Sequence, residues 1–125
     1  MTVHIGLIDD DSSVRRAVSR LLQTHGYFCT TYESGEAALA DPAIIRMNCM
    51  IVDIQLGGMN GFEFCDQLDS VGASIPHVFI TAHLETDLSD YSGRLGKSRL
   101  LTKPFEENQL IDSIKTSMNP INFDE

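Results

Sequence analysis

The sequence predicts an α/β fold in which a doubly wound, five-stranded parallel sheet carries helices on both faces. Five short apolar runs alternate along the chain with segments whose apolar residues recur at helical spacing. Runs with little polar alternation are typical of strands that are covered on both faces. The length of 125 residues suits one such core and is too short for a second.

The first quarter of the chain predicts a strand, a helix and a second strand. Residues 3–8 form the first apolar run. In the helix that follows, Asp11 or Ser12 can cap the first amide groups, and Gly26 supplies the stop. Residues 27–32 are rich in aromatic and β-branched side chains, which favours a strand. The residues at helical spacing are Val14, Ala17, Val18, Leu21 and His25.

The middle of the chain predicts two helices on either side of a third strand. Ser34 offers a helix cap, Glu36 suits the positive end of the helix dipole, and Pro42 limits how far this helix runs. Residues 49–52 form a continuous apolar run that ends abruptly in Asp53. A loop and a third helix starting at Asn60 follow, marked by Gly57, Gly58, Phe64 and Leu68.

The last third of the chain predicts two more strands and two more helices. Residues 78–80 form a fourth strand that Thr81 terminates, and residues 84–95 have the spacing of a fourth helix. Residues 100–101 make a brief fifth strand before Lys103 and Pro104. The last helix carries its apolar residues at Leu110, Ile111, Ile114 and Met118. Right-handed crossovers leave few topologies open and favour the doubly wound type. The strand order that we expect is the flavodoxin-like order 2-1-3-4-5.

Composition limits the classes of partner. We expect one domain over residues 1–120, with residues 121–125 as a C-terminal tail. Eighteen acidic residues against nine basic ones give a net charge of -9, which would repel nucleic acid phosphates. No apolar run approaches the roughly 20 residues of a membrane span, and the start of the chain does not have the pattern of a secretory signal. We therefore expect a cytoplasmic protein without direct contact to nucleic acid or membrane.

Polar residues stand at the ends of four predicted strands. Asp9 and Asp10 follow the first strand, Asp53 ends the third, Thr81 ends the fourth, and Lys103 follows the fifth. In doubly wound sheets, ligands bind beyond the carboxyl ends of the strands, so these five side chains should converge. Each residue alone has an ordinary explanation as a helix cap, a turn residue or a loop residue. Their joint placement is what indicates a functional site.

Three carboxylates brought close together repel one another, and a cation or raised pKa values must relieve the repulsion. Mg²⁺ suits such a site because it prefers oxygen ligands and leaves room for a phosphoryl oxygen. Lys103 adds a fixed positive charge. Asp53 could then serve as the nucleophile, in line with a phosphoryl donor.

Four motifs, in this order and spacing, resemble the receiver domains of two-component response regulators. The resemblance spans nearly the whole chain, and residues 11–15 and 61–63 also resemble receivers that are joined to helix-turn-helix transcription factors. The four motifs are Asp9-Asp10, Asp53, Thr81-Ala82 and Lys103-Pro104-Phe105.

The resemblance implies a ligand set for Mg²⁺. Asp10 would bind the ion directly and Asp9 mainly through water. Asp53 would be both a metal ligand and the phosphoacceptor, and the main-chain carbonyl of Gln55 would complete the protein ligands.

The resemblance also implies roles for residues around the phosphoryl group. Thr81 would donate a hydrogen bond to that group, and Lys103 would pair with it, before a cis peptide bond to Pro104. Gln55 and His83 would tune how long the phosphoryl group survives.

Two positions depart from the habit of the receiver family. Leu100 stands where an aromatic switch residue is usual, so we expect the output signal to use a route other than the usual coupling between Thr81 and an aromatic ring. Gly57 stands beside Gly58, where proline commonly follows the acceptor by four positions. The loop therefore has more freedom and more ordering entropy to lose, and metal affinity could suffer.

The implied function is a signalling switch rather than an enzyme, although the domain would assist its own phosphorylation and dephosphorylation. A histidine kinase or phosphotransfer protein would supply the phosphoryl group. A partner or output domain would read the face made by the fourth helix, fifth strand and fifth helix, and a phosphorylation-dependent homodimer is a further option. The chain would be either a single-domain regulator or the receiver part of a longer transcription factor.

Three other functions compete with this interpretation. A phosphatase-type hydrolase would need a second carboxylate beside the nucleophile, but position 55 is Gln. A flavin-binding electron carrier would need a phosphate loop after the first strand, where residues 9–11 are all aspartate and would repel the phosphate. An unphosphorylated, receiver-like interaction module remains as the alternative.

Overall fold

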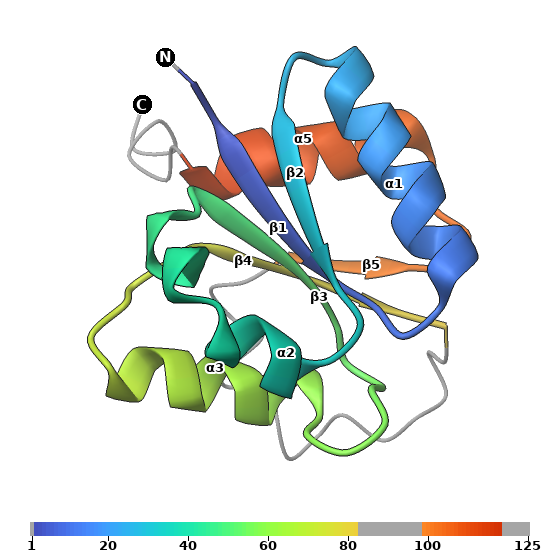
Figure 1. The fold of residues 1–125 in the computed structure, drawn as a ribbon. Helices are drawn as coiled ribbons and strands as arrows, with labels where there is room; N and C mark the ends of the chain where they lie inside the picture. The colour runs from blue at the N-terminus through green and yellow to red at the C-terminus, as the bar shows by residue number, and fades with distance from the viewer. Residues whose placement is uncertain (1, 83–98, 119–125) are drawn as a thin grey trace.

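The computed structural model describes residues 2–82 and 99–118, and within them a five-stranded parallel sheet has the order β2-β1-β3-β4-β5 (Figure 1). The predicted sheet and strand order are therefore confirmed. The predicted fourth helix, His83 and the tail lie outside the described residues. The strands are β1 (His4–Ile8), β2 (Phe28–Tyr32), β3 (Cys49–Asp53), β4 (His77–Thr81) and β5 (Arg99–Thr102). The helices are α1 (Ser12–Thr24), α2 (Gly35–Ala40), the 3-10 helix η1 (Pro42–Arg46), α3 (Gly61–Ser70) and α5 (Glu107–Met118).

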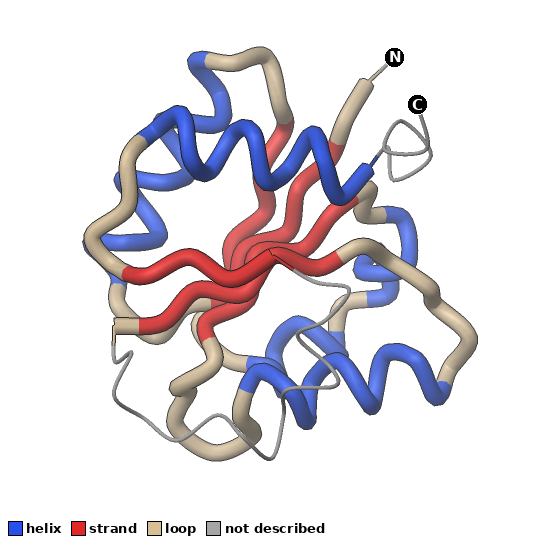
Figure 2. The backbone as a smooth tube through the Cα atoms, turned by 180° about the vertical axis from the view of Figure 1, so that it is seen from behind, coloured by secondary structure: helices blue, strands red, loops and turns tan. Residues whose placement is uncertain are grey.

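Helices cover both faces of the sheet, as Figures 1 and 2 show. Helices α1 and α5 pack on one face and α2, η1 and α3 on the other, each side with its own apolar core. Successive residues of β3 divide between the two cores. Ile51 belongs to the α1/α5 core, whereas Met50 and Val52 belong to the α2/α3 core. Alternate strand residues point to opposite faces, so a strand covered on both sides is apolar throughout.

The parallel register brings the carboxyl ends of the strands to one edge of the sheet. Ile8 pairs with Tyr32 of β2 and Val52 of β3, and Thr81 pairs with Thr102 of β5. The residue after β1 and the last residues of β3 and β4 are consequently neighbours. The polar strand ends predicted from the sequence meet there.

Local capping accounts for where α1 and α3 begin. The Asp11 carboxylate accepts the Ser13 N–H at 2.9 Å and caps α1, which leaves Asp10 in the short link between β1 and α1. Asn60 caps α3 in a reciprocal capping box with Glu63. Helix α3 therefore begins at Gly61, one residue after the predicted start.

Two details differ from the sequence-based expectation. The helix before Pro42 ends at Ala40, as proline requires, but Pro42 then starts a 3-10 helix because the Asp41 carboxylate caps Ala43. In α1 the fully buried side is centred on Val18 and Leu22, and Ala17 is exposed. Val14 and Leu21 are partly buried and pack against the same core, so most of the predicted stripe faces the sheet, and only Ala17 and His25 of it are exposed.

Candidate functional site

The acidic cluster lies at the carboxyl end of the sheet. Asp9 follows β1 directly, and its N–H donates to the Tyr32 carbonyl at 3.2 Å. Asp53 is the last residue of β3, and Asp10 is exposed in the link to α1. Each of these three aspartates offers one carboxylate oxygen, and the three oxygens lie within 4.8 Å of one another. Asp9 is completely buried and Asp53 is 4% exposed, so water does little to relieve their repulsion.

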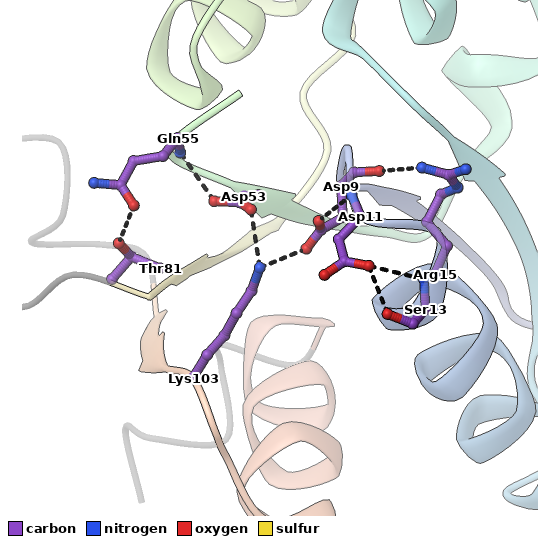
Figure 3. A network of polar contacts seen from close by, with 8 residues as sticks. All are labelled: Asp9, Asp11, Ser13, Arg15, Asp53, Gln55, Thr81 and Lys103. Carbon is purple, nitrogen blue, oxygen red and sulfur yellow. Dashed lines mark hydrogen bonds and ion pairs between the residues drawn. The ribbon is translucent and has the colours of Figure 1, made fainter. Parts of the chain in front are cut away.

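A single lysine links the two buried carboxylates (Figure 3). The Nζ atom of Lys103 lies 2.8 Å from Asp9 Oδ2 and 3.0 Å from Asp53 Oδ2. The main-chain N–H of Lys103 donates to the Thr81 carbonyl at 2.8 Å, and this bond holds Lys103 beside the end of β4. The predicted cis peptide bond to Pro104 is present. Lys103 thus enters the acidic cluster from the β5 side.

Asp9 has two differently used carboxylate oxygens. Oδ1 accepts the Asp11 N–H at 2.9 Å. Oδ2 is buried and paired with the Lys103 charge, yet it makes no aligned hydrogen bond to any residue within 2–82 and 99–118. A buried carboxylate oxygen with spare acceptor capacity is suited to binding a cation.

Gln55 joins Asp53 to Thr81. Its main-chain N–H donates to Asp53 Oδ1 at 2.9 Å, and its side-chain Oε1 accepts from the Thr81 hydroxyl at 3.2 Å (Figure 3). Thr81 is buried at the end of β4. The structure therefore brings six of the predicted site residues together, while the roles given to them stay predictions. They are Asp9, Asp10, Asp53, Gln55, Thr81 and Lys103.

The family assignment follows from comparison with known proteins. The model of the response regulator receiver domain family matches residues 5–115. The chain belongs to this family. Receiver domains are signalling modules rather than classical enzymes.

Curated relatives of this receiver domain are longer proteins. The chain is 30% identical to the response regulator protein TmoT of Ectopseudomonas mendocina, covering 91% of this chain and 52% of that protein. It is 29% identical to the transcriptional regulatory protein FixJ of Azorhizobium caulinodans, covering 94% of this chain and 55% of FixJ. The chain therefore spans about half the length of these relatives.

Solved structures show the same fold. The chemotaxis protein CheY4 of Vibrio cholerae superposes with a TM-score of 0.83 at 26% identity, covering 94% of this chain and 99% of CheY4. The response regulator StyR gives a TM-score of 0.84 at 30% identity, covering 96% of this chain and 61% of StyR.

Burial is the main influence on the electrostatics of the receiver site. Burial raises the pKa of Asp53, and the nearby Asp9 charge raises it further, against the opposing effects of the Gln55 N–H and Lys103. For Lys103, burial lowers the pKa, but the two carboxylates together outweigh burial and raise it. Lys103 is therefore a fixed cation, and the two buried carboxylates share it. This leaves the acidic cluster short of positive charge.

The donor set fits a hard divalent cation. Asp9, Asp10 and Asp53 supply only oxygen ligands, and the exposed side of Asp10 leaves the cluster open to water. The acceptor capacity that Asp9 Oδ2 keeps beside its ion pair with Lys103 supports the same conclusion. The acidic triad could therefore bind a metal ion.

Leu100 lies on β5, half-buried, and packs against the α2/α3 core. An aliphatic side chain thus occupies the position of the usual aromatic switch residue. His83 follows the last described residue of the β4 segment, so its predicted role has no structural counterpart here.

Sequence reasoning did not connect two supporting residues with the site. The Arg15 guanidinium donates to the Asp9 main-chain carbonyl at 2.7 Å, which fixes the backbone beside the acidic cluster. The Glu36 carboxylate accepts the Met59 N–H at 3.3 Å, across 23 residues of sequence. Only indirect signals mark them in the sequence. Arg15 lies in the segment of residues 11–15 that resembles other receivers, and Glu36 is marked only as an acid at the start of a helix.

No helix within the described residues is long and apolar enough to cross a membrane.

Proposed function

We propose that this receiver domain is a phosphoacceptor switch that takes a phosphoryl group onto Asp53 from a histidine kinase or phosphotransfer protein, with Mg²⁺. The observation that carries the proposal is the arrangement around Asp53. Its carboxylate ends β3, lies in a cluster with Asp9 and Asp10, and pairs with Lys103 at 3.0 Å. A buried nucleophile beside a cation site and a fixed ammonium group is the arrangement that phosphoryl transfer requires.

The transfer step exchanges one bond to phosphorus for another. A carboxylate oxygen of Asp53 forms a bond to phosphorus while the bond from phosphorus to the donor's imidazole nitrogen breaks. The leaving imidazole nitrogen takes a proton from solvent, and Asp53 becomes an acyl phosphate. The work of the protein is to position the groups and to neutralise charge.

Asp9, Asp10, Asp53 and the main-chain carbonyl of Gln55 would hold Mg²⁺, with Asp10 as a direct ligand and Asp9 acting mainly through water. The bound ion would supply neutralisation of the charge on the phosphoryl oxygens. The residues of the chain do the rest of the positioning.

Thr81 and Lys103 would orient the phosphoryl group. The Lys103 ammonium is already 3.0 Å from Asp53 Oδ2, so it would pair with a phosphoryl oxygen after a small movement. The Thr81 hydroxyl donates to the neutral Gln55 amide oxygen, and a charged phosphoryl oxygen would be a stronger acceptor. Phosphorylation would therefore draw Thr81 away from Gln55.

The output of the switch would pass to a partner protein or output domain. Of the proposed recognition face, β5 and α5 lie within the described residues. Because Leu100 replaces the usual aromatic residue, the signal would travel by a route other than a swinging ring. A phosphorylation-dependent homodimer through the same face is a further form of output, and the cytoplasm is the proposed location.

Intact-protein mass spectrometry tests the proposal directly. The full chain is incubated with acetyl phosphate and Mg²⁺, and the expected product carries the added mass of one phosphoryl group. Asp53→Asn should show no added mass, and chelation of Mg²⁺ should suppress the reaction. Unmodified wild-type protein under these conditions would reject the proposal in favour of an unphosphorylated interaction module.

The lifetime of the phosphoryl group tests the residues proposed to tune it. Gln55→Ala and His83→Ala are compared with the wild type after removal of the phosphodonor. Altered decay in either variant supports the assignment, and unchanged decay in both refutes it.

A further inference from the structure

The loop between β3 and α3, residues 54–60, has a conformationally permissive centre. Gly57 and Gly58 are adjacent, and Gly58 has a φ of +78°, which other residues rarely adopt. A Cβ added to Gly57 would meet nothing within 4 Å. Two adjacent glycines lose more conformational entropy on ordering than other residues do. The loop needs specific contacts if it is to keep one conformation.

Backbone contacts hold the two ends of this loop. The Ile54 N–H donates to the Ile80 carbonyl at 2.9 Å, and the Gly61 N–H donates to the Ile54 carbonyl at 3.0 Å. A Cβ on Gly61 would lie 2.7 Å from the Asp53 carbonyl oxygen, so α3 begins directly against the end of β3. These contacts leave the glycine pair itself unrestrained.

Helix α2 supplies the contact at the centre of the loop. Glu36 Oε2 accepts the Met59 N–H at 3.3 Å and lies 3.0 Å from the position that a Cβ on Gly58 would take. The neighbouring Gly35 allows the side chain of Met59 to come close, since a Cβ there would lie 3.1 Å from Met59 Sδ. The start of α2 thus contacts both the backbone and a side chain of the loop.

We propose that Glu36 is a positioning residue for phosphoryl transfer, acting through the loop and not on the reacting atoms. By tethering Met59 and covering Gly58, its carboxylate holds the loop that carries Gln55. Gln55 stands two residues before the glycine pair, and its main-chain N–H donates to Asp53 Oδ1 at 2.9 Å. The contact between Glu36 and Met59 therefore restricts the motion of the loop, which Gly57 and Gly58 do not restrict themselves. The kinetic part of this proposal rests on the proposed function.

Glu36→Gln keeps the shape of the side chain and removes its charge, and Glu36 is exposed, so the fold should be retained. We expect the rate of phosphorylation by acetyl phosphate to fall about threefold to tenfold, as for an exposed charge-assisted hydrogen bond. In Mg²⁺-free protein, hydrogen exchange at the Gln55 and Met59 amides should accelerate by a similar factor. Glu33→Gln, which removes the same charge from another exposed position, should change neither.

A second variant separates loop order from loss of charge. The φ of Gly57 is not positive and its Cβ would enter open space, so Gly57→Ala stiffens the loop without a clash. Adding Gly57→Ala to Glu36→Gln should restore most of the lost rate and slow the exchange again. Restoration of both would be difficult to explain if Glu36 acted only through its charge.

Two outcomes would overturn the inference. One is unchanged exchange of the loop amides in Glu36→Gln, whether or not phosphorylation slows. The other is a double variant that stays as slow as the single one. If the wild type takes up no phosphoryl group at all, the proposed function fails, but the exchange measurement still decides whether Glu36 orders the loop.

Discussion

Replacing Lys103 by methionine would remove the cation that two buried carboxylates share. The Lys103 Nζ atom lies 2.8 Å from Asp9 Oδ2 and 3.0 Å from Asp53 Oδ2, and the lysine side chain is only 20% exposed. Removing one partner of a buried ion pair costs about 3–5 kcal/mol of unfolding free energy, and the open side of the cluster favours the lower value. A loss of about 3 kcal/mol corresponds to a decrease in Tm of roughly 10 °C for a domain of this size.

The loss of stability in Lys103→Met should depend on pH in a defined direction. Without the lysine, burial and the Asp9 charge act on Asp53 with less opposition, so its folded-state pKa rises further above the unfolded value. A carboxyl group with a raised folded-state pKa favours folding when it is protonated. The deficit should therefore be smallest below the ordinary aspartate pKa of about 3.9 and grow as the pH rises through the raised value.

Urea unfolding followed by circular dichroism, in Mg²⁺-free buffer between about pH 4 and pH 8, measures this dependence. Lys115→Met, at an exposed position of α5, is the matched control and should change the free energy of unfolding by no more than about 0.5 kcal/mol. Adding Asp53→Asn to Lys103→Met should recover much of the loss at neutral pH. A Lys103→Met variant as stable as the wild type at neutral pH, or equally destabilised at every pH, would refute the reasoning.

Three further predictions concern the metal, a helix cap and the core. Mg²⁺ at about 100 times its dissociation constant should stabilise the wild type by about 3 kcal/mol in thermal unfolding, and Asp10→Asn should lose this gain; equal gains would exclude Asp10 as a ligand. Asn60→Ala removes the cap shared with Glu63 and should cost about 1 kcal/mol in urea unfolding; no loss would contradict the capping box. Phe62→Ala should cost about 3–5 kcal/mol, because Phe62 is 1% exposed and its ring centroid lies 4.8 Å from that of Phe79; a cost below about 1 kcal/mol would contradict tight packing.

The strands were predictable because their signal is local. An unbroken apolar run such as residues 49–52 can bury all of its side chains only in a strand whose sheet is covered on both faces. The predicted boundaries differ from the observed ones by about one residue, since β3 includes Asp53 and β4 begins at His77. The sequence-based prediction missed the 3-10 helix after Asp41, because a proline indicates where a helix ends but does not indicate the conformation that follows.

Convergence of the site residues was also predictable, for a topological reason. Strands that run parallel end at the same edge, so Asp9, Asp53 and Thr81 had to meet once the strand order was known. Which oxygen meets which donor was not predictable. That Lys103 bridges Asp9 and Asp53 depends on the rotamers of long side chains in a shared, partly buried space.

The linear sequence by itself determined the sheet, the order of its strands and the set of residues at its carboxyl edge, because hydrophobic burial and chain connectivity act through patterns that repeat along the chain. Only the tertiary structure decided the contacts of Gln55 with Thr81 and of Glu36 with Met59. Both join residues that are 23 or more positions apart, and both involve the β3–α3 loop. The path of that loop follows from how α2 and α3 pack, and packing between helices leaves no periodic mark in the sequence of a glycine-containing loop.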